Sequence, residues 1–396
     1  MRRLSAAALL IPLCLAAAAA GAAGDLDRAI GAALFKRAWV PAPSSTRAND
    51  GLGPLHNARS CLACHGGMAR QPVRLDEAGV VLGENLVLRL SDREGRPDPV
   101  YGVQLQTSGL PGVPGEGRAV RSGSGYAARD LAYGPIAPTT RVGARLAPAL
   151  SGLGLLEQVP ESAILAIADE QGRSPDGIRG RPNWLSAPDG SRRLGRFGLK
   201  ASLPTLAEQV EAAFELDLGM STPGRNRPAG DCTPAQPACL AAPTGAEYGK
   251  PEIAAELVDL LTHFLAARPA PEAKAADPAG SALFEAIGCA MCHRPSLPSA
   301  RGAVSAYTDL LLHDLGPELD GGATEPGVAP TEWRTAPLWG ISGTIAGGAG
   351  LLHDGRARTV ADAVAHHGGE AASARARFRA LSPLDRERLL AFVSSL

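Results

Sequence analysis

The chain contains the five-residue pattern Cys-x-x-Cys-His twice. The two copies consist of Cys61, Cys64 and His65, and of Cys289, Cys292 and His293. Two cysteines at this spacing can form thioether bonds with both vinyl groups of one haem, and the histidine that follows can ligate the iron. A zinc knuckle or a thioredoxin-like pair also uses Cys-x-x-Cys, but neither requires a histidine directly after it. Two copies therefore predict two covalently bound haems c.

The N-terminus has the features of a secretory signal peptide. Arg2 and Arg3 precede an apolar run over residues 6–20, and the small-residue stretch AGAAG follows before Asp25. We predict that residues 1–24 are a signal peptide removed on maturation, which places the mature protein in the periplasm. No later segment approaches the roughly 18 apolar residues of a membrane span, so the mature protein is expected to be soluble.

Two cysteines remain outside the haem motifs and the predicted signal peptide. They are Cys232 and Cys239 in the loop DCTPAQPACL. In an oxidising compartment they are expected to form a disulfide that closes a small proline-containing loop. A metal site is not expected there, because no histidine or further cysteine stands near them in the sequence.

Composition limits the remaining alternatives. A chain of 396 residues leaves room for two or so domains, and a hydrophobic content of 45% supports a sizeable core. A formal net charge of −1 does not suggest binding to nucleic acid or to an acidic membrane. The 47 glycines and 33 prolines predict long connecting loops.

The order of a helix, a haem motif, loops and a closing helix occurs twice along the chain. Apolar residues at helical spacing precede the first motif over residues 25–39, and Asp277 followed by Pro278 predicts a capped helix start before the second. The closing helices are predicted over residues 253–267 and from Ser382 to the C-terminus, with Ser382 as the N-cap. This order predicts two haem-binding units in tandem.

This organisation predicts a domain boundary after the first closing helix. We expect an N-terminal haem domain with insertions over residues 25–268, a linker over 269–277 and a C-terminal haem domain over 278–396. The glycine-rich segment over residues 107–125 and the loop around Cys232 are interpreted as surface insertions in the longer first domain.

Ordered sequence blocks from about Phe35 to the C-terminus resemble a known family. The blocks are NARSCLACHGG, RLAPALSGLGLLEQVPESAILAIAD, DGIRGRPN, GRFGLKASLPTLAEQVEAAFELDLG, CTPAQPAC, YTDLLLHDLGPELDGG, EWRTAPLWGI and LLHDGRARTVADAVAHHGGEA. Together they resemble the di-haem oxidoreductases, a thiol-oxidoreductase-like family related to the bacterial di-haem cytochrome c peroxidases.

The resemblance implies a mainly α fold of two cytochrome-c-like haem lobes, with long loops and a larger N-terminal half. One haem would react with hydrogen peroxide, and the other would receive electrons from a donor protein such as a small cytochrome c or a copper protein. Relatives bind calcium between the lobes, but no residue of this sequence is assigned to that ion. The alternatives are a di-haem electron carrier without peroxidase activity and an oxidase of a thiol or protein substrate.

The resemblance also implies a catalytic role for Glu208 at the N-terminal haem. In the related peroxidases, a helix similar to TLAEQV carries a glutamate directly before the glutamine, over the open face of that haem. A carboxylate near the iron can move a proton from the inner to the outer oxygen of peroxide. The alternative is that Glu208 is a solvated helix residue.

The second axial ligand of the C-terminal haem is expected to be His367. In the related peroxidases a ligating methionine follows the segment resembling HDG by 14 residues, and counting 14 from His353 leads to His367. Ligation by His293 and His367 would lower the reduction potential, because a thioether favours reduced iron more than imidazole does. The adjacent His366 is the alternative ligand. His353 itself and His313 are expected to lie near a haem propionate or the linking loop, without ligating the iron.

The sequence departs from the related peroxidases after the first haem motif. Many of them have a histidine about 16 residues beyond the first ligand histidine, and it blocks the iron until reduction. Here that position is Val81, and no histidine occurs between His65 and His263. The departure favours an open N-terminal iron; the alternative is a ligand from elsewhere, such as Met68 or Met220.

Overall fold

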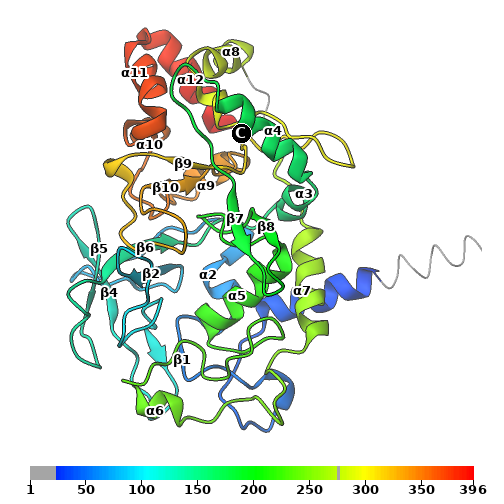
Figure 1. Ribbon diagram of the computed structural model, residues 1–396, viewed down its shortest axis with the longest axis vertical. Helices are drawn as coiled ribbons and strands as arrows, with labels where there is room; N and C mark the ends of the chain where they lie inside the picture. Colours follow the sequence, from blue (N-terminus) through cyan, green and yellow to red (C-terminus); the bar gives the residue numbers. More distant parts are fainter. Residues whose placement is uncertain (1–23, 274–276) are drawn as a thin grey trace, which may run out of the picture.

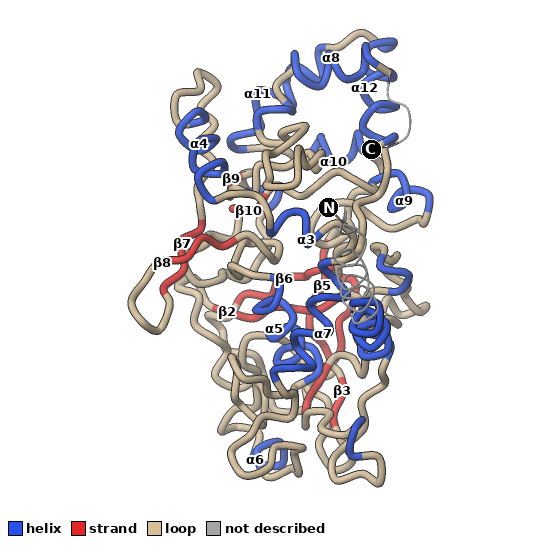
Figure 2. The backbone as a smooth tube through the Cα atoms, turned by 90° about the vertical axis from the view of Figure 1, so that its right-hand side faces the viewer, coloured by secondary structure: helices blue, strands red, loops and turns tan. Residues whose placement is uncertain are grey.

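The structure is a computed structural model that describes residues 24–273 and 277–396. The predicted signal peptide lies outside these ranges except for its last residue, and so do residues 274–276 of the predicted linker. The helices that follow the second haem motif gather at one end of the molecule, and the strands lie in its middle and at its other end (Figures 1 and 2).

The described helices are short apart from five that exceed ten residues. The first covers residues 24–36. The α-helices that follow are α2 Cys61–Cys64, α3 Leu153–Glu157, α4 Glu161–Gln171, α5 Leu206–Leu218, α6 Pro237–Leu240, α7 Ala255–Ala266, α8 Pro278–Ala286, α9 Ile341–Ala346, α10 Val360–Ala365, α11 Ala372–Ala380 and α12 Pro383–Ser395. Single 3₁₀ turns are η2 Arg47–Asn49, η3 Gly66–Met68, η4 Cys289–Met291, η5 Pro317–Leu319 and η6 Gly369–Ala371.

The strands form antiparallel pairs rather than one large sheet. The pairs are β1 Leu55–His56 with β3 Ser108–Gly109, β2 Leu86–Ser91 with β6 Arg141–Leu146, β4 Arg118–Ser122 with β5 Gly125–Arg129, β7 Asn183–Ser186 with β8 Arg192–Gly195, and β9 Leu312–Asp314 with β10 Glu332–Arg334. The β2–β6 pair runs in register from Leu86 opposite Leu146 to Ser91 opposite Arg141.

The prediction of a mainly α fold with two cytochrome-c-like lobes is wrong. Helices make up 32% and strands 16% of the structure, and the described residues do not form two such lobes. Segments predicted as loops instead form hairpins. In the glycine-rich segment, Gly123 has a φ of 57° and allows the tight turn from β4 into β5. Such a turn matches the twist of paired strands, and glycine adopts it without steric cost.

Two predicted helix starts are confirmed in detail. Asp277 caps α8 by accepting a hydrogen bond from the Ala279 amide at 3.0 Å, and Pro278 is the first residue of that helix. Ser382 caps α12 by accepting from the Asp385 amide at 3.2 Å. In both helices the cap satisfies an amide that has no partner inside the helix.

The buried apolar residues form three main clusters. The largest surrounds α3, α4, α5 and α7, and it includes residues between Leu297 and Leu311 from beyond the second motif. The second draws on residues 284–396 and centres on Phe284 and Phe392, whose rings are 5.5 Å apart. The third fills the space between β2, β6 and the β4–β5 hairpin. The second haem motif therefore lies at the edge of the second cluster, and the chain that follows it enters the first.

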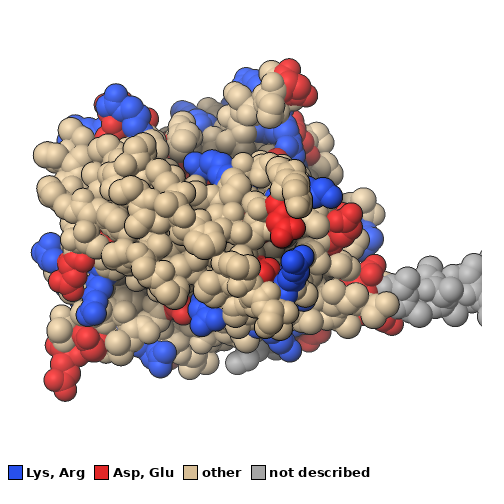
Figure 3. All heavy atoms as spheres, turned by 90° about the horizontal axis from the view of Figure 1, so that it is seen from below, with Lys and Arg blue, Asp and Glu red and all other residues tan. Residues whose placement is uncertain are grey.

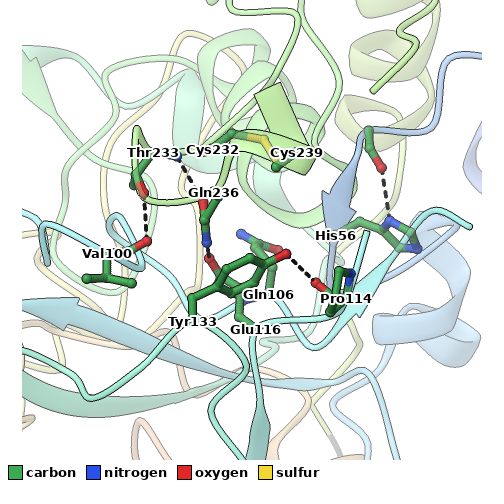
Figure 4. Close-up of a disulfide and its surroundings, with 11 residues drawn as sticks. His56, Val100, Gln106, Pro114, Glu116, Tyr133, Cys232, Thr233, Gln236 and Cys239 are labelled. Atoms are coloured by element: carbon green, nitrogen blue, oxygen red, sulfur yellow. Dashed lines mark hydrogen bonds between the residues drawn. A yellow bond between two sulfur atoms is a disulfide. The ribbon is translucent and has the colours of Figure 1, made fainter. Parts of the chain in front are cut away.

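The structure joins the sulfurs of Cys232 and Cys239, whose Cα atoms are 5.9 Å apart. Figure 4 shows the residues around this disulfide. The side chain of Gln236, inside the loop that the disulfide closes, donates to the carboxyl group of Glu116. Glu116 also accepts from the Gln106 amide at 2.5 Å. The buried carboxyl group of Glu116 thus attaches the disulfide loop to the segment that leads into β4.

Glu116 should make the stability of the protein depend on pH. Burial raises the pKa of this carboxyl to about 8, although its hydrogen bonds from Gln106 and Gln236 oppose the change. The folded protein therefore holds a proton that the unfolded chain releases above about pH 4.3. The free energy of unfolding should fall as pH rises from about 5 to 8. We expect the free energy of unfolding of Glu116→Gln to fall less over this pH range, as measured by urea unfolding. Equal pH dependence in both proteins would contradict the raised pKa of Glu116.

On the face in Figure 3, acidic and basic side chains are interspersed around a broad uncharged area, and neither sign dominates. This distribution agrees with the net charge of −1. Among the described helices, none combines the length and the apolar character that crossing a membrane requires.

Candidate haem-binding site

A single cavity of about 900 Å³ reaches both Cys-x-x-Cys-His motifs. Its wall is mostly apolar and comes from both halves of the chain. Histidines that line it are His65, His293, His313, His353 and His367. The structure therefore brings five of the predicted haem-site histidines together, although they are spread over about 300 residues of sequence.

The first motif begins with the short helix α2. Ser60 caps it by accepting from the Ala63 amide at 3.2 Å. His65 follows as the helix ends, and its Nδ1 donates to the Pro148 carbonyl at 2.9 Å. A carbonyl can only accept, so Nδ1 carries the hydrogen. Burial lowers the pKa of His65, which keeps the ring neutral and leaves Nε2 with a free lone pair.

The second motif repeats this arrangement. The Nδ1 atom of His293 donates to the Tyr307 carbonyl at 2.9 Å, so Nε2 is again the free nitrogen. Burial lowers the pKa of His293 to about 4. In both motifs, therefore, the backbone fixes the ring tautomer that an iron ligand requires.

His367 offers a third imidazole of the same kind. It follows α10, which begins with a capping box formed by Thr359 and Asp362. The Nδ1 atom of His367 donates to the Ala363 carbonyl at 2.7 Å, and burial lowers its pKa. His367 and His293 line the same cavity. The adjacent His366 caps the end of α10 and is not among the residues of the cavity wall.

The four motif cysteines are not bonded to one another. Burial raises the pKa of each of these thiols, so they are held protonated. Cys64, Cys289 and Cys292 line the cavity, and Cys61 packs against the first core cluster. Thiols beside a cavity and histidines with a free Nε2 facing it fit covalent attachment of haem at both motifs.

Comparison with known families agrees with this geometry. The model of the family described as "Di-haem oxidoreductase, putative peroxidase" matches residues 135–396. The chain belongs to this family. It is accordingly an oxidoreductase of a haem-binding family, and the resemblance stated from the sequence is confirmed.

Other comparisons add little to the identification of this di-haem oxidoreductase. No curated protein matches the chain. A solved structure that it resembles is the Kuenenia stuttgartiensis hydrazine synthase pressurised with 20 bar xenon, at 18% identity and a TM-score of 0.27. That match covers 37% of this chain and 57% of the other.

Cationic residues lie beside His353 in the same cavity of the di-haem oxidoreductase. The His353 ring stacks on Trp333 at 4.0 Å, and the Lys200 Nζ atom lies 3.5 Å from the centre of the Trp333 ring. Burial, followed by the charges of Arg145 and other cations, lowers the pKa of His353 well below its usual value. The His353 ring is therefore neutral. The backbone carbonyl of His353 accepts from the Leu146 amide at 2.8 Å.

Two of these cations suit the carboxylates of haem. Arg70 and Arg145 line the cavity, and the Nε atom of each is buried without a hydrogen-bond partner. Burial lowers the pKa of each guanidinium to about 10. A buried donor without a partner is costly, and an anionic group in the cavity would satisfy it. The propionates of haem are such groups.

Glu208 of the di-haem oxidoreductase is placed differently from the sequence-based expectation. Its carboxylate accepts from Arg193 at 2.6 Å and from the Thr205 hydroxyl at 2.9 Å, at the start of α5. It is half-buried and does not line the cavity. The structure thus gives Glu208 the contacts of a helix-capping residue, and its acid–base role stays a prediction.

Gln209 is the residue of α5 that sequence reasoning missed. One face of this helix lines the cavity and is formed by Gln209, Ala212, Ala213, Leu216 and Asp217. The last four follow Gln209 by three, four, seven and eight positions, which is the spacing of one helical face. The same spacing in the sequence could have selected Gln209 in place of Glu208.

The methionines considered as ligands are placed away from the cavity. Met68 and Met220 are both buried in the first core cluster, and neither lines the cavity wall among the described residues. Val81, at the position of the blocking histidine in relatives, donates its amide hydrogen to the Ala119 carbonyl at 2.9 Å. None of these three residues is among the described residues that line the cavity with His65.

Proposed function

We propose that this di-haem oxidoreductase is a periplasmic peroxidase that reduces hydrogen peroxide at an N-terminal haem c with electrons received through a C-terminal haem c. The proposal rests on the different numbers of histidines that the two motifs have beside them. His293 and His367 both face the cavity with free Nε2 atoms, whereas the first motif brings His65 alone among the described residues. Iron with two protein ligands exchanges electrons with little rearrangement, and iron with an unfilled position can bind peroxide.

The haem-binding residues follow from the motifs and the cavity. Cys61 and Cys64 would form thioethers with the first haem and His65 would bind its iron. Cys289, Cys292 and His293 would do the same for the second, with His367 opposite. When bound, haem iron supplies the redox chemistry, and the protein supplies attachment, orientation and exclusion of water. Arg70, Arg145 and His353 would lie beside propionates.

The α5 face supplies the wall at which peroxide would bind. Ala212 and Ala213 are small and leave space, while Leu216 is apolar and excludes water. The Gln209 amide can donate a hydrogen bond to one peroxide oxygen and accept one from the other. An amide does not titrate near neutral pH, so Gln209 would orient peroxide rather than act as its acid or base.

Glu208 and Gln209 give opposite expectations that one experiment can compare. Removing a positioned hydrogen-bond donor costs on the order of 10² in rate, so we expect Gln209→Leu to lower peroxide turnover by about that factor. Glu208→Gln retains an acceptor for Arg193 and can donate to the Thr205 hydroxyl, so it should remain within a few-fold of the unmutated protein. Steady-state turnover with a reduced small cytochrome c would measure both. A loss of about 10²-fold or more in Glu208→Gln would restore its predicted acid–base role.

Stopped-flow mixing of the fully reduced protein with peroxide tests the proposed activity itself. A peroxidase should reoxidise rapidly, with a rate that saturates as the peroxide concentration rises. An electron carrier without its own chemistry would reoxidise slowly and without saturation, and that result would contradict the proposal.

The location, the donor and the domain division are part of the same proposal. The charged and apolar stretches at the N-terminus and the bonded sulfurs of Cys232 and Cys239 support export to an oxidising compartment. A small cytochrome c or copper protein would be the electron donor. The start of α8 at Pro278 and a core cluster drawn from residues 284–396 support domains over 25–268 and 278–396 joined by a linker over 269–277.

A further inference from the structure

A buried charged network lies beside the second motif, outside the groups that the proposed function uses. Its centre is His313 in β9, which is almost fully buried. The Nε2 atom of His313 lies 2.8 Å from the carboxylate of Asp309, and its Nδ1 atom lies 2.7 Å from the carboxylate of Glu370. Carboxylates only accept, so both ring nitrogens must donate. His313 is thus an imidazolium between two carboxylates.

The neighbouring groups favour this charged state. Burial opposes a charge on His313, but the Asp309 charge and the hydrogen bonds to Asp309, Cys292 and Glu370 raise its pKa well above the usual value. Burial also opposes charge on Asp309 and on Glu370, yet His313 lowers the pKa of both. An unpaired charge at this depth would be strongly unfavourable, so the three groups stabilise one another as a unit.

The network touches the second motif directly. Cys292 Sγ lies 3.7 Å from His313 Nδ1. The buried side chain of Gln171, at the end of α4, donates to Asp309 at 2.8 Å and to the Met291 carbonyl inside the motif at 2.6 Å. The residues that carry the His293 side of the haem are therefore tied to Asp309 and His313.

The network also reaches the segment that carries His367. Glu370 follows His367 by three residues, and besides His313 it accepts from the Asp314 amide at 3.2 Å. In the same segment the Gly368 amide donates to the Leu315 carbonyl at 3.1 Å. His313 and its neighbours in β9 thus connect the two pieces of chain that would bind opposite faces of one haem.

A metal ion is a poorer explanation of the same residues. Donor atoms of Cys292, Asp309 and His313 lie within 4.8 Å of one another. A zinc site would need Cys292 as a thiolate, but thioether formation with haem uses that sulfur. It would also need a neutral His313 with a free nitrogen, whereas both ring nitrogens already contact carboxylates.

We propose that His313 is a positioning residue that joins the Cys292 side of the C-terminal haem to the His367 segment and thereby keeps both axial histidines on the iron. The inference rests on the proposed function, because it requires a haem at the second motif with His367 as a ligand. The Asp309–His313–Glu370 unit should also influence the reduction potential of this haem, because fixed charges beside a haem change its potential.

The test uses the full chain with both haems attached and compares His313→Asn, Glu370→Gln and a control, Glu387→Gln. Glu387 is exposed on α12 and does not line the cavity, so its replacement removes one negative charge from the same half of the chain without touching His313. Optical titrations measure two quantities, the midpoint potential of the C-terminal haem and its affinity for cyanide.

The two variants should change the potential in opposite directions. At a pH high enough to keep both carboxylates ionised, His313→Asn removes the cation between them and should lower the potential, because negative charge favours ferric iron. Glu370→Gln removes one negative charge and should raise it. Both variants loosen the His367 segment, so cyanide affinity at this haem should rise about 10–100-fold, the usual effect of removing a partner of a metal ligand. Glu387→Gln should change neither quantity, because solvent screens an exposed charge.

Unchanged potentials in both variants, or shifts of the same sign, would overturn the role of His313. If His313→Asn fails to fold, the sign of the Glu370→Gln shift still decides, because that carboxylate is partly exposed and its replacement is nearly isosteric. A failure of the proposed function looks different: the unmutated protein would lack the second covalent haem, or His367→Ala would leave its low-spin signal unaltered.

Discussion

A variant with serine at both Cys289 and Cys292 is expected to carry one covalent haem instead of two. Each thioether pair belongs to one porphyrin, so the loss should be complete at one site and absent at the other. Cys61→Ser with Cys64→Ser should produce the reciprocal loss. Intact mass measurement of the mature chain after denaturation counts the haems directly.

The disulfide cysteines provide the matched control for this experiment. Cys232→Ser with Cys239→Ser removes two cysteines of the same exported chain and should leave both haems attached. A second consequence concerns stability, because Phe284, Phe378, Leu389 and Val393 of the second core cluster line the cavity and would lose their apolar partner. Two haem additions in either motif variant, or fewer than two in the unmutated protein, would contradict the assignment.

Replacing His367 by methionine is expected to raise the reduction potential of the C-terminal haem substantially. Thioether ligation favours reduced iron, and axial ligands together move haem potentials over about 0.8 V. The change should appear in a spectroelectrochemical titration as a shift of one of two waves. His366→Met is the control, since His366 caps α10 and is not part of the cavity wall. A shift in His366→Met with none in His367→Met would show that the ligand was wrongly assigned.

Local signals explain what the sequence predicted well. The Cys-x-x-Cys-His motifs and the caps at Asp277 and Ser382 lie within short stretches, and each has a direct physical meaning. The 14-residue spacing to His367 came from the family resemblance. The structure places both motifs and His367 on one cavity and confirms both caps.

The fold class was mispredicted because the strands are short and weakly patterned. Apart from β2 and β6, with six residues each, no strand of the described chain exceeds five residues, and glycine and proline dominate the segments around them. Alternation of buried residues is visible in β2, where Leu86, Leu88 and Leu90 face the core. Pairing partners such as β2 and β6 are about 50 residues apart, and the sequence alone provides no register for them.

Parts of the site depend on long-range contacts that no local pattern reveals. Gln171 and Asp309 are 138 residues apart, and the Pro148 carbonyl that orients His65 is 83 residues from it. Glu208 and Gln209 show a finer limit. The family resemblance selected Glu208 on α5, and the orientation of that helix places the adjacent Gln209, and not Glu208, on the cavity wall.

Electron paramagnetic resonance of the fully oxidised, unmutated protein tests the central claim most directly. We propose two protein ligands for the C-terminal iron, His293 and His367, and one for the N-terminal iron, His65. One low-spin and one high-spin ferric signal of equal weight are therefore expected. Two low-spin signals would show that the N-terminal iron also has a second strong ligand, and would contradict the proposed division of roles between the two haems.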